Sequence, residues 1–427
     1  MKNKWTLVAF LCALFVVYTI DRALLGVLAV PIQNETGLDN VRFGVLSAAV
    51  FWTYSVCVPF SGLAGDRFNR ARLIGIAVTV WSAMTFLAGF ATGFWSLLLL
   101  VSVAICAPQT LYGPSANALI AEHHDETRTF AMSCHQAAYY TGWFVSGAAV
   151  AGVLAVFGNW RWAFFVFGTV GLLLGVSFLL WSRRFAPAIR MVEQSSKPTV
   201  KQSIKAFFGC RSAMLVAVCY VAEVFVGYGY SAWGPKFIAQ KFNLSASVAA
   251  TGVMFWHYAA AFAAILVAGR VTDRFVVRWP RFRLALSASA LVVTMPALVL
   301  FGTSDSLPVV WAASATLGAM LGVIGANQFT VIFDVVPSQY RAGSIGFLNV
   351  IAGLVGSLSP IVLGALSQAR GVAGFEFGFA AMAGVQVIAC LALVVAATRT
   401  FLADRKSERE KFRIMPTGNT ETKGAQA

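Results

Sequence analysis

The sequence predicts an all-helical membrane protein with about twelve transmembrane helices in two groups of six. Three observations lead to this fold class. Of the 427 residues, 59% are hydrophobic and only 11% are charged, and the mean hydropathy is +0.75, outside the range of soluble globular domains. Apolar runs of about 20 residues, long enough to cross a bilayer as a helix, recur along the whole chain. A long polar stretch divides these runs near the middle.

The first six apolar runs fill the N-terminal part of the chain. The run that begins at Trp5 has charges in its middle and lacks a cleavage-site pattern, so we expect a retained helix and not a signal peptide. The six expected spans are Trp5–Val30, Val41–Leu63, Leu73–Gly93, Ser96–Ala121, Phe130–Val156 and Trp162–Trp181.

Six further runs follow a polar stretch that contains EQSSKPTVKQS, a composition typical of a linker. Their expected spans are Ala213–Ala239, Val248–Ala268, Leu284–Gly302, Leu307–Phe333, Ala342–Leu366 and Phe375–Ala397. We therefore divide the chain into an N-terminal six-helix half (1–182), a linker (183–212), a C-terminal six-helix half (213–398) and a basic tail (399–427).

The basic residues indicate how the spans are oriented. The formal net charge of +15 could by itself indicate a nucleic-acid partner. Lysines and arginines are concentrated in the loops after even-numbered spans, in the linker and in the tail, whereas the opposite side holds Arg42, Arg161, Lys236, Lys241 and Arg370. The positive-inside rule therefore predicts cytoplasmic termini and a cytoplasmic linker in a multi-pass plasma-membrane protein, which in a bacterium means the inner membrane. The charge requires no nucleic-acid partner.

The sequence predicts neither a metal site nor an enzyme active site. Seven cysteines lie within or beside apolar spans and include no Cys-x-x-Cys pair, as expected of residues that pack between helices. The four histidines are too scattered for a metal site. No nucleophile, base and orienting group occur at a recognisable spacing, and there is no Gly-rich phosphate loop, so we expect no cofactor and no ATP-driven activity from this chain.

Two short motifs recur at equivalent points of the two halves. GLAGDR, residues 62–67, follows the second span, and GRVTDR, residues 269–274, follows the eighth. Asp66 and Arg67 in the first motif correspond to Asp273 and Arg274 in the second. A repeat over such a long interval is typical of a transporter built from two six-helix halves.

Acidic and basic residues also recur where the fourth and tenth spans end. Glu122 is followed by Arg128, and Asp334 is followed by Arg341. Together with the Asp-Arg pairs of the two motifs, these side chains can bridge neighbouring helix ends on the cytoplasmic side. We expect a gate that holds this side shut in one conformation and breaks when the side opens. The alternative is a set of solvated loop residues that only satisfy the topology.

These motifs give the chain a resemblance to the major facilitator superfamily over nearly its whole length. GLAGDRFNRAR resembles the superfamily's motif between its second and third helices. YTIDRALLGVL and NWRWAFFVFG are similar to the anion:cation symporter group of organic-anion and sugar-acid transporters, and GDRFNRARLIGIAVTVWS is similar to bacterial relatives of the spinster lipid transporters. The resemblance implies the major facilitator fold and a transport function.

Asp21 and Arg22 lie roughly midway along the first expected span, where each charge costs a few kcal/mol unless it is paired or faces water. Adjacent residues of a helix point about 100° apart, so the two side chains cannot share one direction. Arg22 is the basic residue that we place deep within a span, and its planar guanidinium suits a carboxylate or phosphate. We expect Arg22 to bind an anionic substrate and Asp21 to carry a coupling proton. A buried structural ion-pair network is the alternative.

The resemblance to the symporter group breaks down at one functional pair. The group's fourth helix usually supplies an arginine and, a couple of turns later, a glutamate. Alignment through GPSANALIAE gives Ser102 and Gln109 at these positions. A serine provides no countercharge, and a glutamine takes up no proton in the physiological range. This departure puts proton coupling by the group's usual pair in question.

The seventh expected span supplies another carboxylate and several aromatic residues. Glu223 is either a second protonatable group or a residue near the helix end that contacts the membrane interface. Tyr228, Tyr230 and Trp233 lie among glycines and can line a polar cavity suited to a sugar-derived or aromatic substrate. An interfacial aromatic belt is the alternative for these three rings.

Polar residues inside other spans are further candidates for substrate contacts: Tyr139 in the fifth span, His257 in the eighth and Asn327 in the tenth. Hydrogen bonds between helices explain such residues as well as a substrate contact does. Both interpretations remain open at each of these positions.

We expect a monomeric secondary transporter, surrounded by membrane lipid, that works by alternating access between its two halves. The expected substrate is a small organic anion, a sugar acid or other carboxylate, with proton symport through Asp21 and Glu223. Two alternatives remain. One is a transporter of a lysolipid or other amphipath of the spinster type, and the other is a membrane-embedded sensor that binds a ligand without moving it.

Overall fold

The structure is a computed structural model that describes residues 2–124, 127–182 and 199–406. Within these ranges, the side chains of residues 2, 3, 62, 63, 65–67, 129, 200, 338 and 342 are not described. The described residues form helices and no strand, and twelve of their helical segments are long and apolar enough to cross a membrane. The all-helical fold class predicted from the sequence is confirmed.

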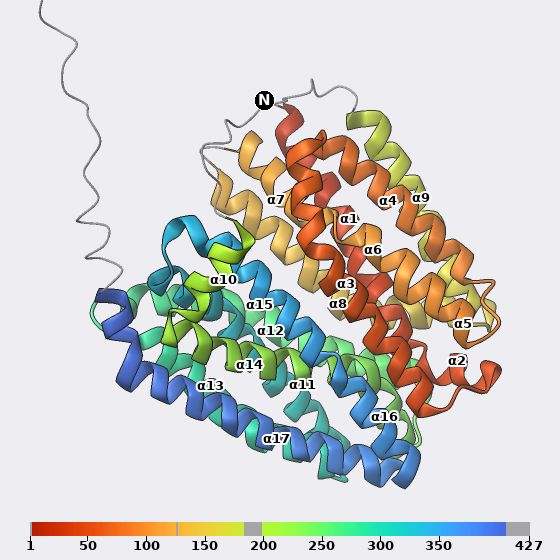
Figure 1. The fold of residues 1–427 in the computed structure, drawn as a ribbon. Coiled ribbons are helices and arrows are strands. Elements are labelled where there is room, and N and C mark those ends of the chain that lie inside the picture. Colours follow the sequence, from red (N-terminus) through yellow and green to blue (C-terminus); the bar gives the residue numbers. More distant parts are fainter. Residues whose placement is uncertain (1, 125–126, 183–198, 407–427) are drawn as a thin grey trace, which may run out of the picture.

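Residues 2–182 form a group of helices that we call the first bundle (Figure 1). α2 is a short helix that turns the chain from α1 into α3. It ends at Gly37, whose φ of 67° is in the left-handed region that favours glycine. The elements are α1 (Lys2–Val27), α2 (Ala29–Thr36), α3 (Asn40–Arg67), α4 (Arg70–Ala88), α5 (Phe94–Leu97), η1 (Leu98–Ile105), α6 (Cys106–Gln109), α7 (Tyr112–His123), α8 (Arg128–Phe157) and α9 (Arg161–Ser182).

The fourth span is interrupted, whereas the sequence predicts a continuous span over Ser96–Ala121. Its first part, η1, is a π-helix, a wider turn that occurs frequently at functional sites. Pro108 lacks a backbone N–H, and the N–H of Leu111 donates to the Pro108 carbonyl in a turn before α7 begins. The irregular segment packs against α3, where the Ser102 hydroxyl donates to the Leu46 carbonyl over 2.9 Å.

Residues 199–406 form the second bundle. Its first helix, α10, lies in the stretch that the sequence assigns to the linker, and Thr199 and Gln202 form a capping box at its start. The eleventh span consists of two helices separated at Ser357. The elements are α10 (Val200–Phe208), α11 (Arg211–Lys241), α12 (Ala246–Val276), α13 (Phe282–Thr303), α14 (Leu307–Val335), η2 (Ser338–Tyr340), α15 (Arg341–Gly356), α16 (Leu358–Arg370), α17 (Val372–Val395) and η3 (Ala396–Thr400).

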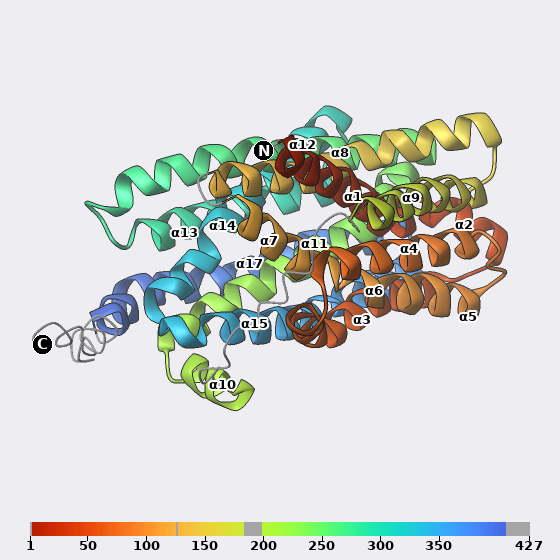
Figure 2. The same cartoon turned by 90° about the horizontal axis from the view of Figure 1, so that it is seen from above.

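The helices of both bundles run between two opposite ends of the molecule (Figures 1 and 2). One end holds α10 and the connection between α3 and α4, and we call it the basic face. The other end holds α2 and the connection from α8 to α9, and we call it the α2 face. Because consecutive spans are antiparallel, every span connects these two faces.

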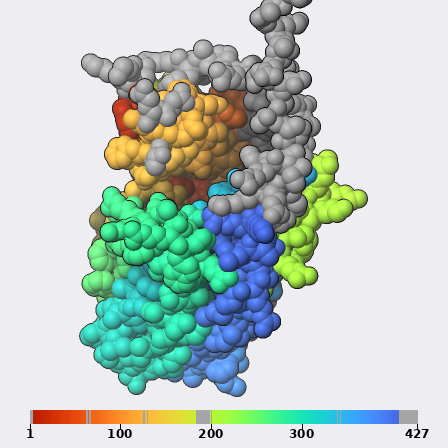
Figure 3. Space-filling model, turned by 90° about the vertical axis from the view of Figure 1, so that its left-hand side faces the viewer, coloured from red at the N-terminus to blue at the C-terminus, as the bar shows by residue number. Residues whose placement is uncertain are grey.

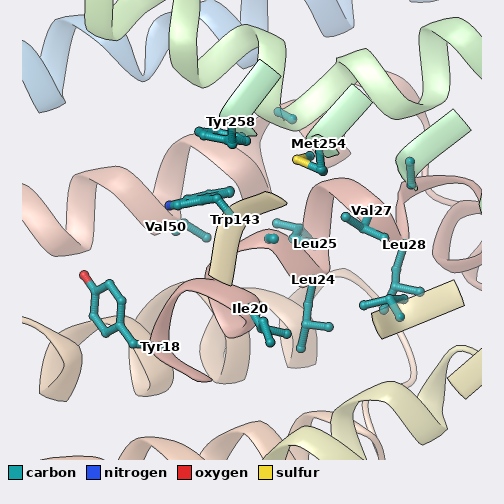
Figure 4. Close-up of a cluster of buried hydrophobic side chains, with 14 of the residues drawn as sticks. Tyr18, Ile20, Leu24, Leu25, Val27, Leu28, Val50, Trp143, Met254 and Tyr258 are labelled. Atoms are coloured by element: carbon teal, nitrogen blue, oxygen red, sulfur yellow. The ribbon is translucent and has the colours of Figure 1, made fainter. Parts of the chain in front are cut away.

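The packing of apolar residues indicates where the bundles join. One cluster of buried residues covers the first bundle and continues into the second. Figure 4 shows part of it, with Leu24 of α1, Trp143 of α8 and Tyr258 of α12. The Trp143 and Tyr258 rings stack across the two bundles with centroids 4.9 Å apart. A separate cluster, which includes Phe207 and Phe401, lies within the second bundle near the basic face. The shared core therefore lies on the side of the α2 face.

Two glycines let the backbones of the two bundles meet in this region. A Cβ atom at Gly147 of α8 would lie 2.6 Å from the Ala250 carbonyl oxygen of α12. A Cβ atom at Gly44 of α3 would lie 2.6 Å from the Pro360 carbonyl oxygen of α16. Because no real side chain tolerates such distances, glycine is required for this close approach.

A polar network joins the bundles at the α2 face itself. The Lys236 ammonium group of α11, which is 8% exposed, donates to the side-chain oxygens of Gln33 and Asn40, each over 2.6 Å. Asn40 in turn donates through its side chain to the Ser367 hydroxyl and through its backbone N–H to the Gln368 side chain, each over 2.9 Å. A buried ammonium group held by amide oxygens thus links α2 and α3 to α11 and α16.

Candidate functional site

Asp21 and Arg22 lie in the last third of α1, because this helix begins at Lys2 and ends at Val27. The sequence predicts a span that continues to Val30, but the chain turns into α2 at Ala29. The two charges are therefore closer to the α2 face than expected, at a level where both bundles contribute side chains.

The Arg22 side chain is surrounded by aromatic rings. Its Nη1 donates to the Tyr18 hydroxyl over 3.1 Å. Its guanidinium carbon lies 4.5 Å from the centroid of the Tyr54 ring and 5.6 Å from those of Tyr18 and Phe51. Cation–π contacts stabilise a cation without neutralising it. Among the described residues no carboxylate pairs with Arg22, so its charge remains available to an anion.

Two of the predicted site residues join this group. Tyr228 of α11 stacks on Phe51 of α3 with centroids 3.4 Å apart, and Tyr228 and Tyr139 of α8 both interact electrostatically with Arg22. Tyr139 and Tyr228 are half-buried, as is Arg22. The structure therefore brings Arg22, Tyr139 and Tyr228 together from α1, α8 and α11, that is, from both bundles.

Asp21 points in a different direction from Arg22, as the helical geometry predicts. Its carboxyl group faces α4, where Trp81 and Thr85 are polar neighbours. Asp21 is 5% exposed, and neither of its carboxyl oxygens has a hydrogen-bond partner among the described residues. The Trp81 indole N–H and the Ser82 hydroxyl of α4 also lack a partner in that part of the chain. An ionised carboxylate at this position would lack the partner that a buried charge requires.

Glu223 lies near the middle of α11 and is 7% exposed. Neither of its carboxyl oxygens has a hydrogen-bond partner within the described residues. Tyr140 of α8 and Tyr220 of α11 are close enough to interact electrostatically with this carboxyl group. The carboxyl group is therefore buried close to the other bundle and away from the helix ends.

Three predicted site residues are packed elsewhere in this conformation. The Tyr230 hydroxyl lies 2.5 Å from the Ser314 hydroxyl and donates to the Val253 carbonyl, and the Tyr230 ring stacks on His257 with centroids 4.3 Å apart. Trp233 is fully buried and donates to the Pro360 carbonyl over 2.8 Å. Tyr230, Trp233 and His257 are not brought to Arg22, and their role in substrate binding stays a prediction.

Asn327 is also buried, and its side-chain N–H group donates to the Val323 carbonyl of the same helix over 2.8 Å. Its side-chain oxygen has no partner among the described residues. Gln109, at the position where the symporter group usually has a glutamate, is 1% exposed and also lacks partners in the described chain. Ser102, at the position of the usual arginine, bonds the backbone of α3 instead.

Sequence reasoning missed the aromatic partners of Arg22. Tyr18 precedes Arg22 by four residues, so helical spacing alone could have placed the two on one side of α1. Phe51 and Tyr54 belong to α3, and no spacing in the sequence relates this helix to α1. Only the packing of the bundle brings them to the guanidinium group.

Two of the predicted gate residues of the first bundle have contacts in the structure, and their role in a gate stays a prediction. Asp66 and Arg67 have side chains outside the described residues. Glu122 forms an ion pair with Arg70 at the start of α4, whereas Arg128 donates to the Ala121 carbonyl over 3.1 Å. The acid at the end of α7 thus pairs with the base at the start of the neighbouring helix α4.

The second bundle repeats this arrangement. Asp334, at the end of α14, pairs with Arg283 at the start of α13 over 2.8 Å, and Arg341 donates to the Val336 carbonyl over 3.0 Å. Asp273 and Arg274 are exposed at the end of α12. Each ion pair between described residues lies within one bundle, so none of these pairs bridges the bundles at the basic face.

A pocket of about 490 Å³ opens in the first bundle between α7 and α8. Its lining consists of Asn117, Arg128, Met132, Ser133 and Gln136, and the lining surface is more apolar than polar. Asn117 and Gln136 are exposed although both belong to membrane-spanning segments. Exposed amides at such positions are expected to face water and not lipid.

Comparison with known proteins now identifies the family. The profile of the Major Facilitator Superfamily matches residues 10–360. The chain belongs to the major facilitator superfamily. The resemblance derived from its motifs is therefore confirmed, and so is the expectation of a multi-pass membrane transporter.

Relatives in this superfamily include sugar-acid transporters and spinster proteins. The hexuronate transporter of Bacillus subtilis (strain 168) is 24% identical over 409 residues, which cover 92% of this chain and 94% of the relative. The D-galactonate transporter of Escherichia coli O6:H1 is 24% identical over 92% of this chain and 96% of the relative. Protein spinster of Drosophila melanogaster is 26% identical over 56% of this chain and 39% of the relative.

Solved structures show the same fold. The bacterial homologue of the human lysosomal transporter Spinster, in an inward-facing and unoccupied conformation, matches 94% of this chain and 98% of its own with a TM-score of 0.82 and 21% identity. The nucleoside transporter NupG matches 94% of this chain and 100% of its own with a TM-score of 0.75 and 14% identity. At these identities the likeness concerns the fold alone.

Proposed function

We propose that this chain is a secondary transporter that moves a small organic anion, a sugar acid such as a hexuronate or another carboxylate, by alternating access with proton symport. The observation that carries the proposal is Arg22, a cation in a membrane-spanning helix without a carboxylate partner among the described residues. A cation at this depth in a membrane-spanning helix is costly without a partner, so the substrate is the natural source of the missing negative charge.

The surroundings of Arg22 suit a hydroxylated carboxylate. The planar guanidinium can donate two parallel hydrogen bonds to a carboxylate. The hydroxyl groups of Tyr18, Tyr54, Tyr139 and Tyr228 are close enough to interact with Arg22 or with one another. Tyrosine hydroxyls both donate and accept hydrogen bonds, as recognition of a sugar's hydroxyl groups requires. The relatives that transport hexuronate and D-galactonate support this choice of substrate class.

The arrangement of the bundles supports alternating access. Backbone contacts, stacked rings and the Lys236 network join the two bundles and close the α2 face. At the basic face, the pairs Arg70–Glu122 and Arg283–Asp334 each stay within one bundle. Figure 3 views the basic face, with the first bundle, in orange, above the second, in green to blue. The positive-inside rule assigns the basic face to the cytoplasm, so this conformation corresponds to an inward-open state. Residues 1–182 and 213–398 would be the two moving halves.

Asp21 and Glu223 are the proposed proton carriers. Both carboxyl groups are buried and lack hydrogen-bond partners in the described residues, so the neutral form is the one that this environment accommodates. Glu223 faces α8 of the other bundle, a contact that must change when the bundles move, whereas Asp21 faces α4 within its own bundle. Release of the proton from Glu223 would then be coupled to the movement of the bundles.

Uptake of labelled glucuronate, a hexuronate, into proteoliposomes tests the proposal. We expect an inward proton gradient to stimulate uptake by the unchanged chain. We expect Arg22→Ala to abolish uptake and Asp21→Asn to remove the stimulation by the gradient. Arg42→Ala is the matched control, because Arg42 is an exposed arginine that pairs with Asp39 at the surface.

The other substrate classes are outcomes of the same experiment. Uptake of a lysolipid but not of any sugar acid in a labelled panel would favour the spinster-type alternative. Binding of glucuronate without accumulation would favour a sensor. Accumulation that is indifferent to Arg22→Ala would reject Arg22 as the anion-binding residue.

A further inference from the structure

One side of α12 changes from exposed apolar residues to exposed arginines as the helix approaches the basic face. Residues 256, 263, 267, 270 and 274 recur at intervals of three, four or seven positions and so lie on one side of the helix. We call this side the outer stripe, and all of its residues are exposed: Trp256, Ala263, Val267, Arg270 and Arg274. Tyr258, which stacks on Trp143 of the first bundle, lies about 200° around the helix from Trp256. Because α12 is a membrane-spanning segment, the outer stripe faces lipid.

The change from apolar to basic residues falls where the hydrocarbon part of a bilayer ends. The exposed apolar side chains before Arg270 extend from Val248 to Val267, about 29 Å along the helix axis at 1.5 Å per residue. This length matches the hydrocarbon core of a bilayer, about 30 Å, and the headgroup layer adds roughly 5–8 Å on each side. Arg270 follows Val267 by about 5 Å and Arg274 by about 10 Å. Both guanidinium groups therefore lie at the level of the lipid headgroups.

The arginines at this end of α12 have no anionic partner among the described residues. Arg270, Arg274 and Arg278 form no ion pair there, and neither does Asp273. Residues 270–283 contain five arginines and one aspartate, so the segment carries an excess of positive charge. A planar guanidinium donates two parallel hydrogen bonds to a phosphate. The three guanidinium groups are therefore available to a phosphate group of the membrane.

Exposed aromatic rings lie beside these arginines at the turn from α12 to α13. The Phe282 ring packs against both Phe275 and Trp279, with centroid distances of 5.1 Å and 5.7 Å. Phe275 and Trp279 are 47% and 50% exposed, and Val277 between them is 82% exposed. The turn lies at the basic face, at the end of the molecule opposite α2 (Figure 2). Apolar surface gains free energy when it leaves water, and aromatic rings prefer the membrane interface. These side chains therefore favour a turn that rests on the membrane surface.

We propose that the end of α12 and the turn into α13 bind the headgroup of an anionic phospholipid in the leaflet at the basic face. Arg270, Arg274 and Arg278 contact the phosphate, while Phe275 and Trp279 lie at the boundary between headgroups and acyl chains. The excess of positive charge favours a lipid with a net negative charge over a zwitterionic one. The outer stripe leads from the acyl-chain region directly to these arginines, so a lipid contacts α12 with both of its parts. The site lies outside the bundles and does not depend on the transported substrate.

Quenching of a local fluorophore tests this site. Val277→Cys places a thiol in the turn, and bimane attached to it is measured in the full-length chain, after subtraction of the signal from the chain without this substitution. The vesicles consist of phosphatidylcholine with the same small fraction of nitroxide-labelled phosphatidylglycerol or nitroxide-labelled phosphatidylcholine. We expect at least about twofold stronger quenching by the anionic lipid, because each basic residue at an anionic surface strengthens association roughly fivefold. High salt should reduce the difference.

Two double variants assign the effect to the arginines of α12. Arg270→Gln combined with Arg274→Gln should bring the ratio of the two quenching signals close to one. Lys201→Gln combined with Lys205→Gln is the matched control, because it removes two exposed charges from α10 at the same face, and it should leave the ratio unchanged. A ratio that survives the loss of both arginines, or that falls equally in the control, would overturn the site.

Two further outcomes of the same measurement would reject the proposal. Equal quenching by both lipids in the chain that keeps its arginines would show a membrane anchor without preference for negative charge. Absence of quenching by either lipid would place the turn away from the membrane, where it would be accessible to a protein partner instead.

Discussion

The α2 face and the basic face of this transporter are built in different ways. At the α2 face, glycines let backbones of different bundles touch, and Lys236 links both bundles through amide oxygens. At the basic face, Arg70 pairs with Glu122 inside the first bundle and Arg283 with Asp334 inside the second. The first set of contacts must break for the bundles to move, whereas the second set can persist. The comparison indicates that ion pairs hold each bundle together, whereas backbone contacts and hydrogen bonds from Lys236 to amide oxygens hold the two bundles against each other.

The largest effect is expected from replacing Gly147, which lets the backbones of α8 and α12 approach each other closely. Gly147→Leu places a side chain where the Ala250 carbonyl oxygen would lie 2.6 Å from the new Cβ atom. Overpacking of this kind costs about 1–3 kcal/mol, which shifts a two-state equilibrium by roughly 5- to 150-fold. We expect the α2 face to open and uptake to fall by about that factor, measured as initial rates in proteoliposomes. Gly152→Leu is the control, because no atom lies within 4 Å of its Cβ position; equal losses in both variants would contradict the comparison.

The polar network should give the next largest effect. Asn40→Ala removes an acceptor of Lys236 and the bond to Ser367, and a buried polar group left without its partner costs about 1–3 kcal/mol. The α2 face should open more often, which is measured as faster alkylation of a cysteine introduced at Trp233. Lys241→Met serves as the control, because Lys241 pairs with Glu376 within the second bundle. Faster alkylation in the control alone would overturn the assignment of the network.

The ion pairs of the basic face should affect stability without changing the contact between the bundles. Arg283→Ala leaves Asp334, which is 23% exposed, without its partner, and we expect a loss of about 1–3 kcal/mol in the free energy of unfolding. Arg70→Ala breaks the more exposed pair with Glu122 and should cost about 0–1 kcal/mol. Thermal unfolding in detergent measures both. A change in the alkylation rate at the α2 face would show that these pairs also act between the bundles.

The smallest effect concerns a pair on the α2 face that stays within the first bundle. Hydrogen bonds from Arg161 and from Trp160 hold the pKa of Glu35 below its usual range. Because the pKa is lowered in the folded state, the stabilisation is complete above the ordinary glutamate pKa and is lost as the pH falls through the lowered value. Thermal unfolding of the unchanged chain and of Glu35→Gln should therefore differ at neutral pH and converge in acid. A difference that grows in acid would contradict this sign.

The sequence predicted the fold because twelve apolar runs of membrane-spanning length leave little choice of class. It named Arg22, Tyr139 and Tyr228 separately, within a larger set of candidate substrate contacts, and only the packing of the helices brings these three together; their role in substrate binding stays a prediction. It did not predict Phe51 and Tyr54, because the rotation of α3 against α1 is decided by packing and leaves no spacing signal.

The repeat of acids and bases was recognised in the sequence, but their pairing was not. The sequence predicts that Glu122 and Asp334 bridge neighbouring helix ends, but it does not indicate which base each of them contacts. Helices α4 and α7 lie side by side, as do α13 and α14, so the bases that start α4 and α13 are closer in space. The π-helix in the first part of the fourth span was also missed. An apolar run without polar residues has no periodicity that would distinguish a π-helix from an α-helix.

The measurement that tests the account most directly is a pair of distances between spin labels on the two faces, with and without glucuronate. Labels at Asn34 and Ser306 report on the α2 face, and labels at Phe68 and Val277 report on the basic face; all four residues are exposed, and the native cysteines are buried or half-buried. The account predicts that glucuronate lengthens the first distance and shortens the second, and that Arg22→Ala prevents both changes. Distances that stay constant while glucuronate is transported, or that change in the same direction, would contradict it.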